Sequence, residues 1–141
     1  RNKMIKRNKT DTVVIHCADT PEDMDIGAEK IREWHTKERG WDDIGYHWVI
    51  RRDGTLDPGR PIEMQGAHAV AVNGSSVGIC LVGRGDNFTE QQFITLHNLI
   101  NTTKDMYGDD LKIIGHCDVE PNKPNCPGFD VEQWVKDEFY G

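Results

Sequence analysis

Short apolar, β-branched runs alternate along the chain with longer segments of helical spacing. Residues 12–16, 46–52 and 111–114 are typical of strands. Asp53-Gly54 directly follows the second run and predicts a tight hairpin turn, because this pair tolerates the positive φ that such a turn requires. Residues 77–82 are apolar throughout, which predicts a central strand covered on both faces of a sheet.

Three segments have the spacing of helices. Residues 26–39 place apolar side chains three and four positions apart. Thr89 and Gln92 form a capping-box pattern at the start of a second helix, which Gly108 ends. Asp130 is placed to cap a last helix. About five strands and about three helices, mixed along the chain, predict an α/β fold with a single mixed sheet packed by helices on both faces.

Length and composition limit the classes of protein. A chain of 141 residues with 36% hydrophobic and 29% charged residues is typical of one globular domain. The net charge of −7 argues against binding to nucleic acid, which needs clustered positive charge. The apolar runs are too short to cross a membrane, so we expect no membrane insertion, and a monomer by default. Residues 1–9 carry the only basic run, and we expect them to be a flexible end.

Two histidines and one cysteine are candidate metal ligands. His16 and His116 end predicted strands, and Cys126 lies in a loop rich in Pro and Asn. Two imidazoles and one thiolate leave a zinc ion with one open position and a charge of about +1, which lowers the pKa of bound water toward ~7. The residues alone leave the alternatives open, because a lone histidine is more often structural and a lone cysteine is more often a small buried side chain.

The other three cysteines are interpreted as small core side chains. Cys17 and Cys117 directly follow the two candidate histidines, and Cys80 lies in the predicted central strand. Neighbouring residues on a strand point to opposite faces. If the histidines face a cleft, Cys17 and Cys117 should therefore face the core. No apolar stretch follows the basic start, so we expect no signal peptide, synthesis in a cytosol, and thiols instead of disulfides.

The chain resembles the bacteriophage zinc amidases that are named lysozymes, and it also resembles the related peptidoglycan-recognition proteins. The similar stretches run in order through nearly the whole domain: residues 15–20, 31–35, 39–50, 52–55, 66–68, Asn73, 76–83, 115–116 and 126–129. Trp-Asp-Asp-Ile-Gly-Tyr-His and Cys-Pro-Gly-Phe are highly specific together. The resemblance implies the amidase fold and a single catalytic domain over residues 1–141, without a separate wall-binding domain.

The resemblance also implies roles for particular residues. His16, His116 and Cys126 match the family's ligands of one Zn²⁺ ion, and Tyr46 and Lys123 match its catalytic residues. Lys123 lies three residues before the cysteine, whereas the family's lysine lies two before it, so a solvated surface lysine is the alternative.

Four further positions are predicted to contact substrate. They are His68, Trp41, Asn73 and Arg52. His47 should point away from Tyr46 and is interpreted as structural. The histidines at positions 35 and 97 are assigned no function.

The implied reaction is hydrolysis of the amide between N-acetylmuramic acid and L-alanine in peptidoglycan, by an endolysin that degrades the wall during host-cell lysis. Such a bacteriolytic enzyme would be made in the host cytoplasm and reach the periplasmic wall after the membrane is permeabilised. A non-catalytic recognition module, an added inhibitor surface for phage RNA polymerase, a bacterial recycling amidase and a carboxylate-based muramidase are the alternatives.

Overall fold

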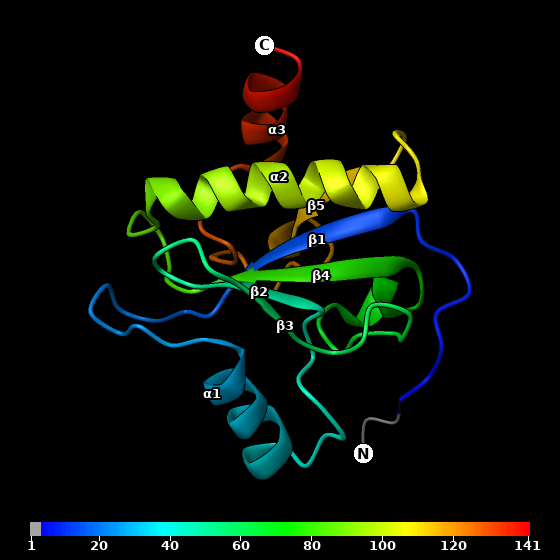
Figure 1. Cartoon of the computed structure of the whole chain (residues 1–141), viewed down its shortest axis with the longest axis vertical. Helices are drawn as coiled ribbons and strands as arrows, with labels where there is room; N and C mark the ends of the chain where they lie inside the picture. The colour runs from blue at the N-terminus through cyan, green and yellow to red at the C-terminus, as the bar shows by residue number, and fades with distance from the viewer. Residues whose placement is uncertain (1–3) are drawn as a thin grey trace.

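A five-stranded sheet forms the centre of the computed structural model, which describes residues 4–141 (Figure 1). Its order is β3-β2-β4-β1-β5, so the apolar strand β4 is central, as predicted. The strands are β1 (Thr12–Cys17), β2 (Trp48–Ile50), β3 (Leu56–Pro58), β4 (Ser76–Leu81) and β5 (Lys112–Gly115). β2, β4, β1 and β5 run parallel, and only β3 is antiparallel to its neighbour.

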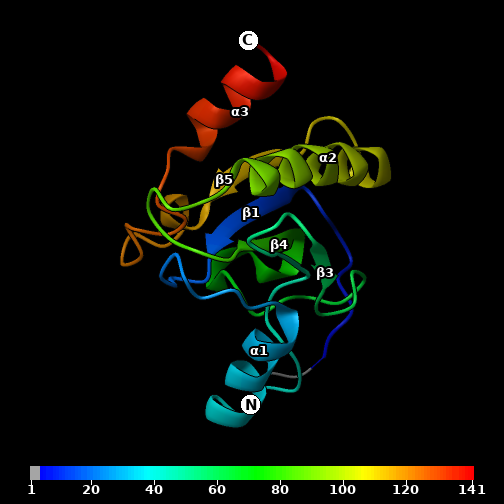
Figure 2. The same cartoon turned by 60° about the vertical axis from the view of Figure 1, so that its left-hand side comes forward.

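Helices cover both faces of the sheet, which confirms the predicted fold class. They are α1 (Ala28–Glu33), which continues as a π-helical turn (Trp34–Glu38), α2 (Glu90–Tyr107) and α3 (Val131–Phe139). Two 3₁₀ turns cover Val70–Ser75 and His116–Asp118. Figures 1 and 2 show α2 on one face and α1 on the other.

Side-chain alternation along the strands divides the core into two layers. Val13 and Ile15 of β1 pack with the apolar side of α2. Val49 and Cys80 pack on the other face with Ile31 of α1. Because His16 pairs with Cys80 in register, its side chain belongs to this second face. The face that packs against α1 is therefore the one that carries the first candidate ligand.

The cysteine predictions have different outcomes. Cys80 is fully buried, as expected of a small interior side chain. Cys17 is only 6% exposed, but it borders the cavity described below, and its thiol contacts the carbonyl of Asn125 (3.8 Å), so it does not face away from the cleft as predicted. Cys117 is only partly buried, so its predicted place in the core is wrong. The reason is local, because β5 ends at Gly115 and a 3₁₀ turn follows, where strand alternation no longer applies.

Near the start of the described chain, where we expected a flexible end, Lys6 and Arg7 make specific contacts. Lys6 forms a β-bridge with Met64. Arg7 is buried, and its guanidinium donates hydrogen bonds to the carbonyl of Met64 (2.9 Å), the hydroxyl of Thr10 (2.7 Å) and the phenol of Tyr107 (3.1 Å). The part of that expectation that concerns residues 1–3 lies outside the described residues. Within residues 4–141, no helix is both long enough and apolar enough to cross a membrane.

Candidate functional site

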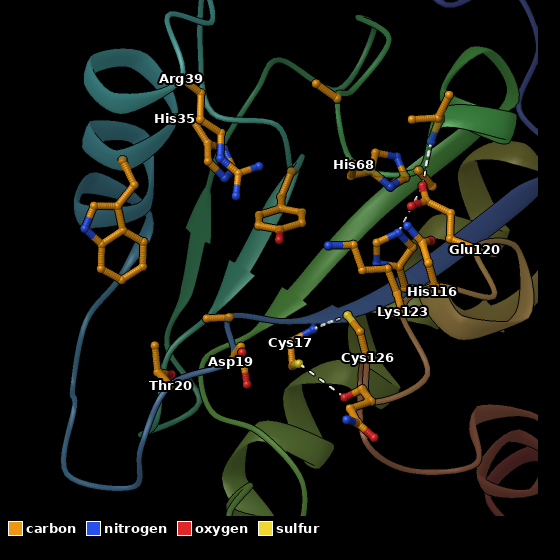
Figure 3. A pocket seen from close by; sticks show the side chains of 18 of the residues that line it. Cys17, Asp19, Thr20, His35, Arg39, His68, His116, Glu120, Lys123 and Cys126 are labelled. Carbon is orange, nitrogen blue, oxygen red and sulfur yellow. Dashed lines mark hydrogen bonds and ion pairs between the residues drawn. The ribbon is translucent and has the colours of Figure 1, made fainter.

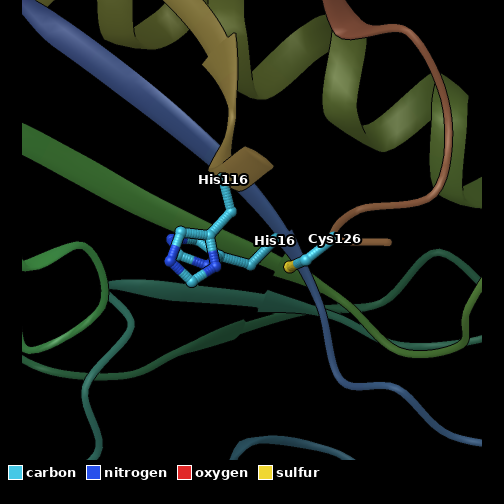
Figure 4. Close-up of side chains that lie close together, drawn as sticks. All are labelled: His16, His116 and Cys126. Atoms are coloured by element: carbon cyan, nitrogen blue, oxygen red, sulfur yellow. The ribbon is translucent and has the colours of Figure 1, made fainter. Parts of the chain in front are cut away.

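The three candidate ligands converge at the carboxyl ends of the parallel strands. His16 is the penultimate residue of β1, and His116 directly follows the neighbouring strand β5. Cys126 returns to the same place because its carbonyl accepts a hydrogen bond from the N–H of Cys117 (2.8 Å). One ligand atom from each of the three side chains lies within 4.8 Å of the others (Figure 4). Residues 100 positions apart in sequence are thus close enough to share one ion.

A chain of hydrogen bonds fixes the tautomer of His16. The hydroxyl of Ser76 donates to the carbonyl of Val72 (2.7 Å), so the oxygen of Ser76 accepts from Nε2–H of His68 (3.2 Å). Nδ1 of His68 must then accept from Nε2–H of His16 (2.8 Å). This arrangement leaves Nδ1 of His16 without a proton and available as a metal ligand.

The two ring nitrogens of His116 also have different roles: one faces a protein acceptor and the other remains for a metal. Its Nε2 atom is buried and has no hydrogen bond of good geometry within the described chain. The same atom lies 3.1 Å from Oε1 of Glu120. Burial raises the pKa of the Glu120 carboxyl, but contacts with His116 and with the N–H of Val70 outweigh burial and lower the pKa overall. An ionised carboxylate therefore faces Nε2, and Nδ1 remains for a ligand.

The thiol of Cys126 has a donor aimed at its sulfur. The N–H of Cys17 donates to Sγ of Cys126 (3.3 Å). The neighbouring Cys17 thiol and burial raise the pKa of Cys126, so the metal-free side chain is a neutral thiol. A metal ion would bind the thiolate and release this proton, and the backbone donor would then stabilise the sulfur's charge. Two imidazoles and one sulfur, each with a second partner in the protein, form a donor set that fits zinc.

Tyr46 and Lys123 lie at this cluster. The rings of Tyr46 and His16 are 5.0 Å apart between centroids. Burial, and then the nearby cysteines, raise the pKa of the Tyr46 phenol well above its usual 10, so it is a hydrogen-bond donor at neutral pH. Lys123 is exposed, yet its side chain lines the cavity beside His116 (Figure 3). The extra residue before Cys126 therefore does not move this lysine away from the site.

A cavity of about 800 Å³ opens in front of the cluster. Trp41 and Asn73, both predicted to contact substrate, line it. Trp41 packs against the ring of His35 (4.6 Å between centroids) and under the guanidinium of Arg39 (5.2 Å). Oδ1 of Asn73 accepts hydrogen bonds from the N–H groups of His68 and of the next residue (both 2.9 Å), so Asn73 also shapes the wall.

Two of the residues predicted to contact substrate have hydrogen-bond partners within the protein. His68 borders the cavity, but it is buried and both its ring nitrogens are taken by His16 and Ser76. Arg52 is not among the cavity-lining residues. Its guanidinium donates to the carbonyl of Val82 (3.2 Å), to Oδ1 of Asn87 (3.0 Å) and to the carbonyl of Asn87. Arg52 thus holds the loop after β4, and its contact with substrate stays a prediction.

Sequence reasoning missed His35, Arg39 and Glu120, which all line the cavity. His35 accepts a hydrogen bond from the N–H of Gly45 (2.9 Å), and burial lowers its pKa to about 4. Its position next to the specific Trp-Asp-Asp-Ile-Gly-Tyr-His stretch could have drawn attention to it. Glu120 had one available signal, its place four residues after a candidate ligand.

Comparison with known proteins gives consistent matches. The sequence model of the N-acetylmuramoyl-L-alanine amidase family matches residues 6–129. The endolysin of Enterobacteria phage K11 is 43% identical over 138 residues, which cover 93% of this chain and 89% of that protein. The endolysin of Escherichia phage T7 is 39% identical, with 92% and 87% covered. Among solved structures, the amidase LysC from Clostridium intestinale URNW has a TM-score of 0.84 and 30% identity, with 97% and 89% covered.

Proposed function

The chain belongs to the N-acetylmuramoyl-L-alanine amidase family, and from this premise we propose that it is a zinc-dependent endolysin. As a member, it is an amidase that acts on peptidoglycan. The zinc assignment rests on one observation, the convergence of two imidazoles and one sulfur within 4.8 Å. The lytic role is supported by similarity to phage endolysins over nearly the whole chain.

The proposed ligands are Nδ1 of His16, Nδ1 of His116 and Sγ of Cys126. When bound there, zinc would supply Lewis acidity to the scissile carbonyl and lower the pKa of water toward ~7. The protein prepares for this by holding the ring of His16 as a neutral imidazole, since burial, followed by the neighbouring His68 and His116, lowers the pKa of His16 well below 6.5. No proton has to leave His16 before a metal can bind.

Tyr46 and Lys123 would act on the amide between the lactyl group of N-acetylmuramic acid and L-alanine. The phenol of Tyr46 would donate a hydrogen bond to the oxyanion as the carbonyl becomes tetrahedral. The ammonium of Lys123, at the cavity wall, would stabilise the same charge or give a proton to the departing amine. Trp41 and Asn73 would hold the sugar or the stem peptide along the cavity.

The alternatives are not favoured. A recognition module needs no metal ligands, whereas the three donors and the tyrosine are all present at this site. A muramidase would need a carboxylate pair, and the matching family is one of amidases. An added surface for phage RNA polymerase has no support in the matches. We propose that the enzyme reaches the periplasmic wall from the host cytoplasm once the membrane is permeabilised.

Digestion of purified peptidoglycan tests the function. The wild type should release free amino groups without new reducing sugar ends, and it should contain about one zinc per chain. Cys126→Ala should lose both zinc and activity, whereas the matched control Cys117→Ala, at a cysteine outside the donor cluster, should keep both. Reducing ends from the wild type, or full activity of a zinc-free Cys126→Ala protein, would contradict the proposal.

A further inference from the structure

Glu120 lines the cavity and contacts both His116 and Val70. It lies in the loop that joins His116 to Cys126, and its side chain is only 18% exposed. Its Oε1 atom accepts a hydrogen bond from the N–H of Val70 (2.9 Å) and lies 3.1 Å from Nε2 of His116 (Figure 3). One carboxylate oxygen therefore contacts both a candidate ligand and the 3₁₀ turn Val70–Ser75.

The environment of His116 shows why this contact matters. The side chain of His116 is 10% exposed, and its Nε2 atom has no well-aligned hydrogen bond within residues 4–141. A buried ring N–H without a partner is unfavourable, and a ligating histidine usually gives its second N–H to a carboxylate or a carbonyl. The carboxylate of Glu120 is already at hydrogen-bond distance, so a small turn of either side chain completes the bond.

We propose that Glu120 is a positioning residue that accepts the Nε2–H of His116 and thereby presents Nδ1 of that ring to the metal. The inference rests on the proposed zinc site and adds a residue to it. His16 has the corresponding support from His68, so each histidine is oriented by a different group. His68 is a neutral partner, whereas Glu120 is anionic and makes its ligand the more basic of the two.

The contact with Val70 gives Glu120 a second effect. Val70 begins the turn Val70–Ser75, which carries Asn73 on the cavity wall. Because the same oxygen binds this turn, the carboxylate is held in place before any metal arrives. A held carboxylate loses little side-chain freedom when it orients His116.

Zinc affinity, measured by competition with a chromogenic chelator at pH 7.5, tests the proposal without relying on activity. Glu120→Ala should bind zinc about 10–100-fold more weakly than the wild type. Glu120→Gln keeps an oxygen acceptor of the same length and should recover most of this loss. Glu132→Ala is the matched control, since that glutamate is 76% exposed on α3 and pairs only with Lys136 among the described residues; it should bind as the wild type does.

A second variant separates the two contacts of Glu120. Val70→Pro removes the N–H that Glu120 accepts but leaves His116 untouched, and the extended backbone of Ala69 (φ −150°, ψ 97°) suits a following proline. This variant should keep zinc affinity within a few-fold of the wild type. The cobalt-substituted proteins should show an altered ligand-field spectrum for Glu120→Ala and an unaltered one for Val70→Pro.

The possible outcomes separate this inference from the proposed function. If the wild type binds no zinc, the proposed function fails. If the wild type binds zinc and Glu120→Ala binds it equally well, only the role of Glu120 is refuted. Equal losses in Glu120→Ala and Val70→Pro would assign the effect to the turn, and that result also overturns the positioning role.

Discussion

His47 should make the fold sensitive to mild acid. Its side chain is 1% exposed, and Nδ1 accepts a hydrogen bond from the N–H of Gly78 (2.9 Å). Nε2 lies 2.7 Å from the carbonyl of Met64, which can only accept, so Nε2 carries the proton. A second proton would have to enter at Nδ1, where it meets the N–H of Gly78. The ring is therefore held neutral, and burial lowers its pKa to about 4.

The size and sign of the effect follow from linkage. The pKa of His47 is lower in the folded state, about 4, than the ordinary 6.5 expected after unfolding. The stabilisation is therefore complete above pH 6.5 and is lost as the pH falls from 6.5 toward 4. Each pH unit within this window removes at most about 1.4 kcal/mol. As the pH falls from 7 to 5, protonation of His47 alone should lower the free energy of unfolding by about 2 kcal/mol.

Urea unfolding at pH 7, 6 and 5, in excess chelator so that metal release does not contribute, measures this loss. His47→Gln lowers stability at pH 7 but should flatten the acid decline by about 2 kcal/mol relative to the wild type. His97→Gln is the matched control, because that ring lies at the surface beside Glu138, and it should not flatten the decline. An equally steep decline in His47→Gln and in the wild type would refute the reasoning.

Three further predictions concern the site and the loop beside it. Tyr46→Phe should keep its zinc but lose about 10²–10³ in kcat, since one oxyanion donor is removed, as zinc analysis and peptidoglycan digestion would show together; an unchanged kcat would exclude that role. Arg52→Ala should lower the free energy of unfolding by about 2 kcal/mol with kcat and KM unchanged, because Arg52 binds Val82 and Asn87 outside the cavity; a raised KM would restore the substrate contact. Dialysis against a chelator should abolish digestion and added Zn²⁺ should restore it, whereas activity that survives complete metal removal would exclude a zinc mechanism.

Elements fixed by local interactions could be predicted from the sequence. The capping box of Thr89 and Gln92 is present at the start of α2, and the carboxylate of Asp130 accepts the N–H of Gln133 at the start of α3. These interactions join residues three positions apart, so the sequence contains both partners. The same holds for the hairpin at Asp53-Gly54, where Gly54 has a φ of +88°.

Roles set by distant partners could not be read in this way. His68 and Arg52 resemble family positions, but each has a hydrogen-bond partner far away in sequence, His16 at 52 residues and Asn87 at 35 residues. Glu120 was missed because its carboxylate is held by the N–H of Val70, which lies 50 residues earlier in the sequence. In each case the sequence shows the chemical type of the side chain, whereas its hydrogen-bond partner comes close only after the sheet has formed.

The histidines connect the stability of the fold with the chemistry of the site. Five of the six histidines are buried, and burial lowers the pKa of four of them, at positions 16, 35, 47 and 68. A neutral imidazole is what a metal requires of His16, and it is also what the hydrogen bonds from Gly45 and Gly78 require of His35 and His47. Acid would therefore oppose folding through protonation of His35 and His47, and it would oppose metal binding through protonation of His16. The buried imidazoles beneath the cavity thus support the proposed zinc site, and their protonation in acid would destabilise it.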